Sequence, residues 1–150
     1  MPLTVQEILD DKLGQGGLTH GIAPDSPVRE AVATMIREDI GSVLVLEAGA
    51  LAGIITLREL LKGLDSQGAR LLDARAAEVM DANPAIVHPE DSADSLRAMM
   101  TERHVSHAPV LKDGRLVGIV SFHDIARSAV KDVAFENRLL KQYIKNWPKD

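Results

Sequence analysis

The feature that most constrains the fold of this chain is that its central segment occurs twice. The octapeptide GIITLREL (53–60) aligns with GIVSFHDI (118–125), and each residue of the second lies 65 positions after its counterpart. The same offset continues upstream without a gap, since Pro24 corresponds to Pro89. A 150-residue chain that repeats itself in this way is expected to form two small units that share one core, because neither half alone buries enough apolar surface.

A shorter similarity marks the head of each unit. VQEIL (5–9) resembles AAEVM (76–80), but here the offset is 71 residues, so the first unit carries six extra residues before Pro24. The intervening DDKLGQGGLTHG (10–21) is rich in glycine and polar residues, and we predict that it is a loop. The chain therefore divides into a first unit (4–64), a second unit (75–128) and a C-terminal tail (129–146).

Periodicity predicts the same order of elements in both units, βαββα: a short strand, a helix, a β-hairpin and a second helix. The first unit gives strand 21–23, helix 27–38, strands 40–46 and 51–56, and helix 57–64. The second unit gives strand 85–88, helix 92–103, strands 104–111 and 116–121, and a helix from Asp124. Such short apolar strands need cover on both sides. We predict an α/β fold of the α+β kind, in which two sheets pack face to face, with pseudo-two-fold symmetry and helices outside.

The tail has an amphipathic pattern, and we predict a C-terminal helix over 129–146. Its apolar stripe consists of Val130, Val133, Ala134, Leu139, Leu140 and Tyr143. One interpretation is that this helix covers the chain's own core. The other, which we favour, is that it packs on a second copy of the chain or on an unidentified client protein, because Phe135, Tyr143 and Trp147 gather here and aromatic residues are common interface anchors.

Composition narrows the class of protein. Hydrophobic residues make up 45% of the chain and charged residues 26%, as in globular domains, and no apolar run approaches the roughly 18 residues of a membrane span. The absence of cysteine excludes disulfides and thiolate chemistry. A net charge of −5 offers no basic surface for nucleic acid. The N-terminus resembles neither a signal peptide nor a transit peptide, so we expect a cytoplasmic location.

Ser121 and Asp124 stand where the last strand of the second unit runs into a helix, and Thr56 and Glu59 hold the same positions in the first unit. This spacing is that of a capping box, which satisfies the free amides of a first helical turn. The alternative is that the pair faces a ligand with hydroxyls and phosphates of its own. The sequence contains no nucleophile elbow, no glycine-rich phosphate loop and no metal-ligand spacing, so we predict no catalytic site, no metal and no required cofactor.

The second unit resembles the CBS domain, named for cystathionine β-synthase, over HAPVLKDGRLVGIVSFHDI (107–125). The first unit matches less closely, with Leu44 in place of a usual proline and Glu59 in place of a usual aspartate. The resemblance covers about residues 4–128 and is that of a tandem CBS pair. It implies a non-enzymatic regulatory module that binds an adenosine-containing ligand (AMP, ADP, ATP, S-adenosylmethionine or NADH) between its units and often forms a homodimer.

The resemblance implies a primary ligand site where the closing motif of the second unit faces the first unit. The carboxylate of Asp124 would accept the ribose hydroxyls, and Ser121 with the helix amides would donate to phosphate. Ile40, Val43 and Ile119 would enclose the base. The full set of expected contacts is Thr19, His20, Gly21, Ile22, Ile40, Gly41, Ser42, Val43, Ile119, Ser121, His123 and Asp124.

A mirror-image secondary site is implied around the closing motif of the first unit. Its expected contacts are Thr56, Arg58, Glu59, Ala85, Ile86, Arg103, Val105, Ser106 and His107. Arg58, Arg103, His104 and His123 would lie near the phosphate ends of the two sites. We rank the secondary site lower because glutamate is one methylene longer than aspartate. The competing hypothesis is a structural dimerisation module with empty, degenerate sites, in which these side chains serve only as caps.

Overall fold

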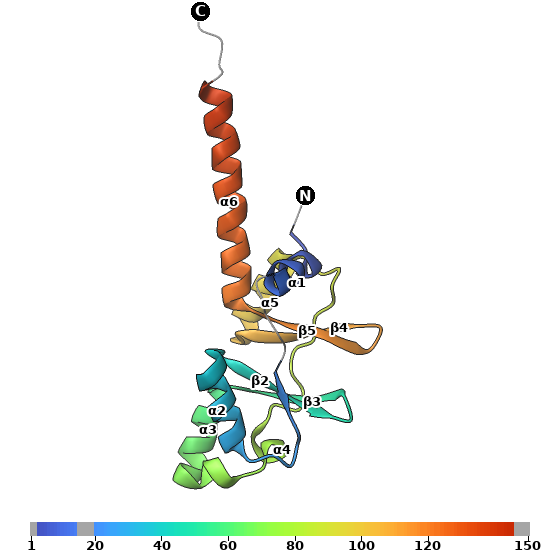
Figure 1. Ribbon diagram of the computed structural model, residues 1–150, viewed down its shortest axis with the longest axis vertical. Coiled ribbons are helices and arrows are strands. Elements are labelled where there is room, and N and C mark those ends of the chain that lie inside the picture. The colour runs from blue at the N-terminus through green and yellow to red at the C-terminus, as the bar shows by residue number, and fades with distance from the viewer. Residues whose placement is uncertain (1–2, 15–19, 146–150) are drawn as a thin grey trace, which may run out of the picture.

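The computed structural model describes residues 3–14 and 20–145, which form two small sheets with helices on their outer faces (Figure 1). Strands β1 (Gly21–Ile22), β2 (Ser42–Glu47) and β3 (Ala50–Thr56) make one sheet, and β4 (His107–Lys112) and β5 (Arg115–Ser121) make the other. The helices are α1 (Val5–Gly14), α2 (Val28–Glu38), α3 (Leu57–Gln67), the 3-10 helix η1 (Gly68–Asp73), α4 (Ala76–Val79), α5 (Ala93–Arg103) and α6 (Phe122–Lys145).

The two sheets face each other, as predicted. Leu44 of β2 and Ile54 of β3 form a buried cluster with Ile119 of β5, and three half-buried leucines complete it. In Figure 1 the two hairpins lie one above the other in the lower half of the view, with α3, α4 and most of α2 below them and α1, α5 and the base of α6 above. The strand pattern of short apolar segments therefore reflects burial between a second sheet and a layer of helices.

The sequence repeat extends to the detail of the backbone. Ser42 pairs with Thr56 in the first hairpin, and His107 pairs with Ser121 at the equivalent place in the second. The pairing shifts after Val45 in one hairpin and, 65 residues later, after Val110 in the other. Helices α2 and α5 both end on a residue in the left-handed conformation, which is a common way for a helix to stop.

Three predicted elements differ from the structure. The predicted strand 85–88 is absent, because this stretch makes only an isolated bridge between Val87 and Val110. Residues 10–14, predicted as loop, continue helix α1; the rest of that predicted loop up to residue 19 lies outside the described residues. The helix predicted from Asp124 and the predicted tail helix are one continuous helix, α6.

Each head packs on the opposite unit. Val5, Ile8 and Leu9 of α1 are buried in the core formed by α5, β4 and β5, whereas Ala76 of α4 is buried in the core formed by α2, β2 and β3. The exchange is reciprocal in its hydrogen bonds: the Val5 amide donates to the carbonyl of Asp91 (2.9 Å), as the Ala76 amide does to that of Ser26 (2.7 Å). The units expected from the sequence group each head with the segment that follows it in the chain, whereas in the structure each head packs on the other unit.

Beyond its base, α6 projects away from the rest of the chain (Figure 1). Ile125 is buried in the core of the second unit, but Val130 and Leu140 are exposed. At these two positions the tail does not cover the chain's own core, contrary to one of the two interpretations. The side chains of Phe135 and Tyr143, and all of Trp147, lie outside the described part of the structure. No helix among the described residues is long and apolar enough to cross a membrane.

Candidate functional site

A cleft of about 620 Å³ lies where the closing motif of the second unit faces the first unit. Eight of the twelve residues predicted for the primary site line it: His20, Ile40, Gly41, Ser42, Ile119, Ser121, His123 and Asp124. They come from the entry to β1, the passage from α2 into β2, the end of β5 and the start of α6. Segments far apart in the sequence therefore meet at one cleft, as the resemblance implied.

Three predicted contacts among the described residues are not found in the cleft lining. Val43 is completely buried in the core of the first unit, Ile22 packs against that same core, and Gly21 is not among the lining residues. Thr19 lies outside the described residues. Because side chains alternate along a strand, Ser42 faces the cleft and Val43 faces the opposite side. Leu44, two residues after Ser42, lines the cleft instead, and strand alternation alone would have identified it.

Both closing motifs form capping boxes. In the second unit the Asp124 amide donates to Ser121 Oγ (3.0 Å) and the Ser121 amide donates to Asp124 Oδ2 (2.9 Å). In the first unit the Thr56 amide donates to Glu59 Oε1 (2.8 Å), and Thr56 Oγ1 caps the helix by accepting from the backbone of α3. The capping role predicted as one alternative is therefore present in both copies, whether or not a ligand also binds.

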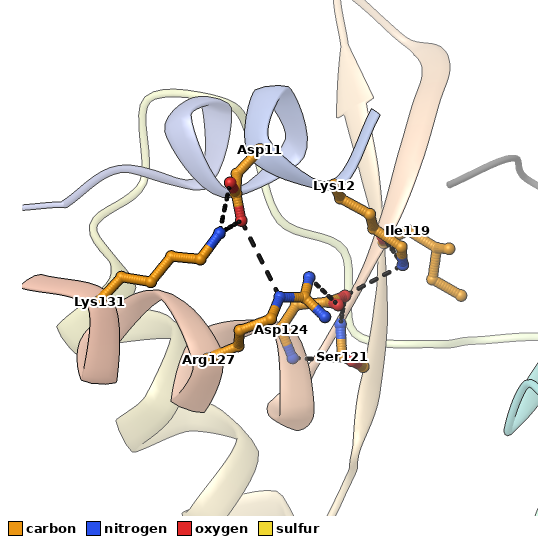
Figure 2. A network of polar contacts seen from close by, with 7 residues as sticks. All are labelled: Asp11, Lys12, Ile119, Ser121, Asp124, Arg127 and Lys131. Carbon is orange, nitrogen blue, oxygen red and sulfur yellow. Dashed lines mark hydrogen bonds and ion pairs between the residues drawn. The ribbon is translucent and has the colours of Figure 1, made fainter. Parts of the chain in front are cut away.

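Asp124 differs from Glu59 in having two further cationic partners (Figure 2). Lys12 Nζ lies 3.0 Å from Asp124 Oδ2 and 3.1 Å from the carbonyl oxygen of Ile119, and Arg127 Nη2 lies 3.1 Å from Asp124 Oδ1. Asp124 is only 4% exposed. This burial by itself raises the pKa of the carboxyl, but the amide hydrogen bond from Ser121 and the ammonium of Lys12 outweigh it and leave the pKa below its ordinary value.

The same network ties the last turn of α1 to α6 (Figure 2). Lys131 Nζ lies 2.9 Å from Asp11 Oδ1, and Arg127 Nε lies 3.9 Å from Asp11 Oδ2. Lys12 and Arg127 both line the primary cleft, although neither was predicted. Lys12 was not predicted as a site residue because its segment was expected to be a loop. Arg127 could have been found from its position one helical turn after Asp124.

The secondary cleft is smaller, about 360 Å³. It is lined by eight of the nine predicted residues: Thr56, Arg58, Glu59, Ala85, Arg103, Val105, Ser106 and His107, together with His104. The ninth, Ile86, lines a separate groove of about 770 Å³ between the tips of the two hairpins. Ala85 is buried and Ile86 is half-buried, and these two neighbours border different hollows.

Ser106 and His107 line both clefts, which places them between the two candidate sites. Ser106 Oγ lies 2.9 Å from His107 Nδ1. Burial lowers the pKa of His107, and the positive charge of Lys12 lowers it further, against opposing contributions from Asp124 and Glu59. A neutral imidazole at the junction of the two clefts follows from these surroundings.

The CBS domain family model matches residues 21–66 and 76–131 of this chain. The chain belongs to the CBS domain family. Its two matches make it a tandem CBS pair, and the head segments that exchange between the units lie before or at the start of each match.

Relatives of known structure share this arrangement. A CBS-domain-containing protein of Agrobacterium tumefaciens is 33% identical and superposes with a TM-score of 0.79, over 86% of this chain and 95% of that one. The CBS domain pair of protein MJ0100, solved in complex with 5′-methylthioadenosine and S-adenosyl-L-methionine, is 25% identical with a TM-score of 0.74, over 88% of this chain and 99% of that one.

A curated relative is the mitochondrial CBS domain-containing protein CBSX3 of Arabidopsis thaliana. It is 33% identical over 125 residues, which are 80% of this chain. The chain spans 61% of the length of that relative.

Proposed function

We propose that this CBS pair is a regulatory module that binds an adenosine-containing ligand in the primary cleft. The observation that carries the proposal is the Asp124 carboxylate, which is ionised, nearly buried, and set in the wall of a 620 Å³ cleft between the two units. A carboxylate accepts hydroxyl groups in charge-assisted hydrogen bonds, which are about twice as strong as neutral ones. The solved CBS pair of MJ0100 with two adenosine-containing ligands supports the same class of ligand here.

The remaining walls of the cleft suit the other parts of such a ligand. Ile40, Leu44 and Ile119 provide an apolar surface for a base, and the start of α6 provides amides and the positive end of a helix dipole for phosphate. Lys12 and Arg127 add positive charge to a chain of net charge −5. The secondary cleft, with Arg58 and Arg103 in its lining, is a second and smaller candidate for the same class of ligand.

The module acts by regulation rather than catalysis. A ligand can regulate only if it binds one arrangement of the two units, or of the helices, more tightly than another. We propose that the functional form is a homodimer and that the ligand state is passed to a client protein, with a cytoplasmic location. Exposed apolar residues support the dimer: Leu57, Leu61 and Leu64 lie at helical spacing along α3, and Leu61 is 67% exposed.

Calorimetric titration tests the ligand. We expect AMP, ADP, ATP, S-adenosylmethionine or NADH to bind the wild-type chain, and Asp124→Asn to weaken binding at least tenfold, because the neutral amide loses the charge-assisted hydrogen bonds, each stabilising by about 1.5–3 kcal/mol. The side-chain carbonyl oxygen of the variant can still accept from the Ser121 amide, so the cap is retained and melting temperature controls for unfolding. Absence of binding by the wild type at millimolar concentration would favour the competing hypothesis of a structural module with empty sites.

A further inference from the structure

We propose that Lys12 is an internal competitor for the ligand-binding carboxylate, and that it sets the preference of the primary cleft for phosphorylated over unphosphorylated adenosine ligands. This inference rests on the proposed function and concerns the same cleft. It assigns a specificity role to the last turn of α1, a segment outside the repeated motif that defines the two units.

The acceptor capacity of Asp124 is almost filled within the chain. A carboxylate offers about four acceptor positions, two on each oxygen. The Ser121 amide and Lys12 Nζ both donate to Oδ2, and Arg127 Nη2 donates to Oδ1. The two hydroxyls of a ribose need two positions, whereas these contacts leave about one. One of the three donors must therefore leave when a ribose binds.

Lys12 is the donor whose departure is easiest. The Ser121 amide is held by the capping box, and Arg127 lies one turn after Asp124 on the same helix, so both stay beside the carboxylate while α6 is folded. Lys12 reaches Asp124 from α1 through a flexible four-carbon side chain. Its departure does not detach α1, because Asp11 is bound separately to Lys131 on α6. Arg127 remains as the counter-ion of Asp124.

The two units differ at this point because their heads have different lengths. Where it packs on the first unit, α4 ends at Val79, and the backbone that follows pairs with β3: the Asp81 amide donates to the carbonyl of Ile54 (2.8 Å). The counterpart of Ile54 in the second unit is Ile119, and there α1 continues as a helix and Lys12 Nζ takes the Ile119 carbonyl instead. The longer head therefore places an ammonium group at the one carboxylate of the primary cleft that faces the proposed ribose position.

Displacement of Lys12 has a different consequence for different ligands. When adenosine binds, the released ammonium gains no anionic partner from the ligand, so the lost ion pair with Asp124 is not replaced. When a nucleotide binds, its phosphate supplies a new partner within reach of the cleft lining, to which Lys12 belongs. Competition by Lys12 therefore weakens adenosine more than AMP, and removal of the ammonium is expected to reduce the difference between the two.

The test is titration of adenosine and of AMP into the wild type, Lys12→Met, Lys12→Gln and a matched control, Lys112→Met, which removes the same charge from the exposed end of β4. We expect Lys12→Met to bind adenosine about tenfold more tightly than the wild type, since a charge-assisted hydrogen bond no longer competes. The ratio of the AMP to the adenosine association constant is expected to fall. Lys12→Gln, which keeps a neutral donor, is expected to lie between, and Lys112→Met to match the wild type.

Two results would overturn the inference while leaving the proposed function intact. One is adenosine affinity in Lys12→Met and Lys12→Gln that is equal to or weaker than that of a binding wild type. The other is an equal gain in Lys112→Met, which would assign the effect to overall charge. If neither adenosine nor AMP binds any of the four proteins at millimolar concentration, the competitor role fails; the proposed function fails with it only if ADP, ATP, S-adenosylmethionine and NADH also do not bind. Melting curves of each variant establish that it is folded.

Discussion

The side chain of Asp124 both caps helix α6 and lines the cleft. It completes the capping box of α6, and its other lone pairs are turned toward Lys12, Arg127 and the cleft. Glu59 makes the equivalent cap, and its Oε1 also accepts from the Thr56 hydroxyl. The difference between the two copies therefore lies less in the extra methylene of glutamate than in the cations that the exchanged head and α6 bring to Asp124.

The surroundings of His107 predict how the stability of the chain depends on pH. Its pKa is lowered in the folded chain, chiefly by burial and then by Lys12, while Asp124 and Glu59 oppose this. The unfolded chain therefore binds more protons than the folded chain between the lowered pKa and the ordinary value of about 6.5, so stability falls as the pH drops through this window. His107→Gln removes that dependence and is expected to lose less stability than the wild type as the pH falls from about 7.5 to about 5.5.

Urea denaturation of the two proteins at several pH values measures this difference. The four other histidines are common to both chains and cancel in the comparison. Parallel loss of stability in His107→Gln and the wild type would contradict a lowered pKa at this position.

The reciprocal exchange of heads explains why a residue without a side chain stands at the start of each closing motif. A Cβ added to Gly53 would lie 2.6 Å from the Met80 sulfur and 2.7 Å from the Asp81 carbonyl oxygen. A Cβ added to Gly118 would lie 2.9 Å from a terminal methyl of Leu9, the residue equivalent to Met80. Both glycines therefore admit the head of the opposite unit against the sheet.

The two glycines make a matched pair of variants. Gly53→Ala is expected to reduce the free energy of unfolding by about 1–3 kcal/mol, because the new methyl meets backbone as well as a side chain. Gly118→Ala meets only the flexible end of Leu9 and is expected to cost less. Chemical denaturation of both variants against the wild type checks the order. Equal stability of Gly53→Ala and the wild type would show that α4 can move away from β3 without loss.

The two units bury one face of each sheet against the other and leave apolar side chains exposed on the outer helices. Leu57, Leu61 and Leu64 of α3 are exposed, and so are Ile36 of α2 and Phe122 at the start of α6. Single exposed apolar residues are ordinary, but three along one helical stripe are typical of a surface that contacts another protein. We propose that a second copy of the chain contacts this surface.

Leu61→Glu tests the dimer. A carboxylate at the centre of this stripe cannot be buried without a partner, so we expect the variant to shift from dimer to monomer in size-exclusion chromatography with light scattering. Gln67→Glu adds the same charge at the exposed end of α3 and is expected to leave the dimer unchanged. A wild type that is monomeric at high micromolar concentration would rule out the dimer, and an unaffected dimer in Leu61→Glu would place its interface elsewhere.

The sequence alone determined the two-unit architecture, its hairpins and the capping motifs, because these depend on local periodicity and on a spacing that recurs after 65 residues. Eight of the twelve residues that the family resemblance implied for the primary site line the cleft. Strand alternation would have placed Leu44 rather than Val43 in the cleft, but only the tertiary structure shows that each head packs on the opposite unit. The same holds for Lys12, which reaches Asp124 across 112 positions of the chain. Such contacts depend on how helices pack on sheets, and packing between distant segments leaves no local pattern in a single sequence.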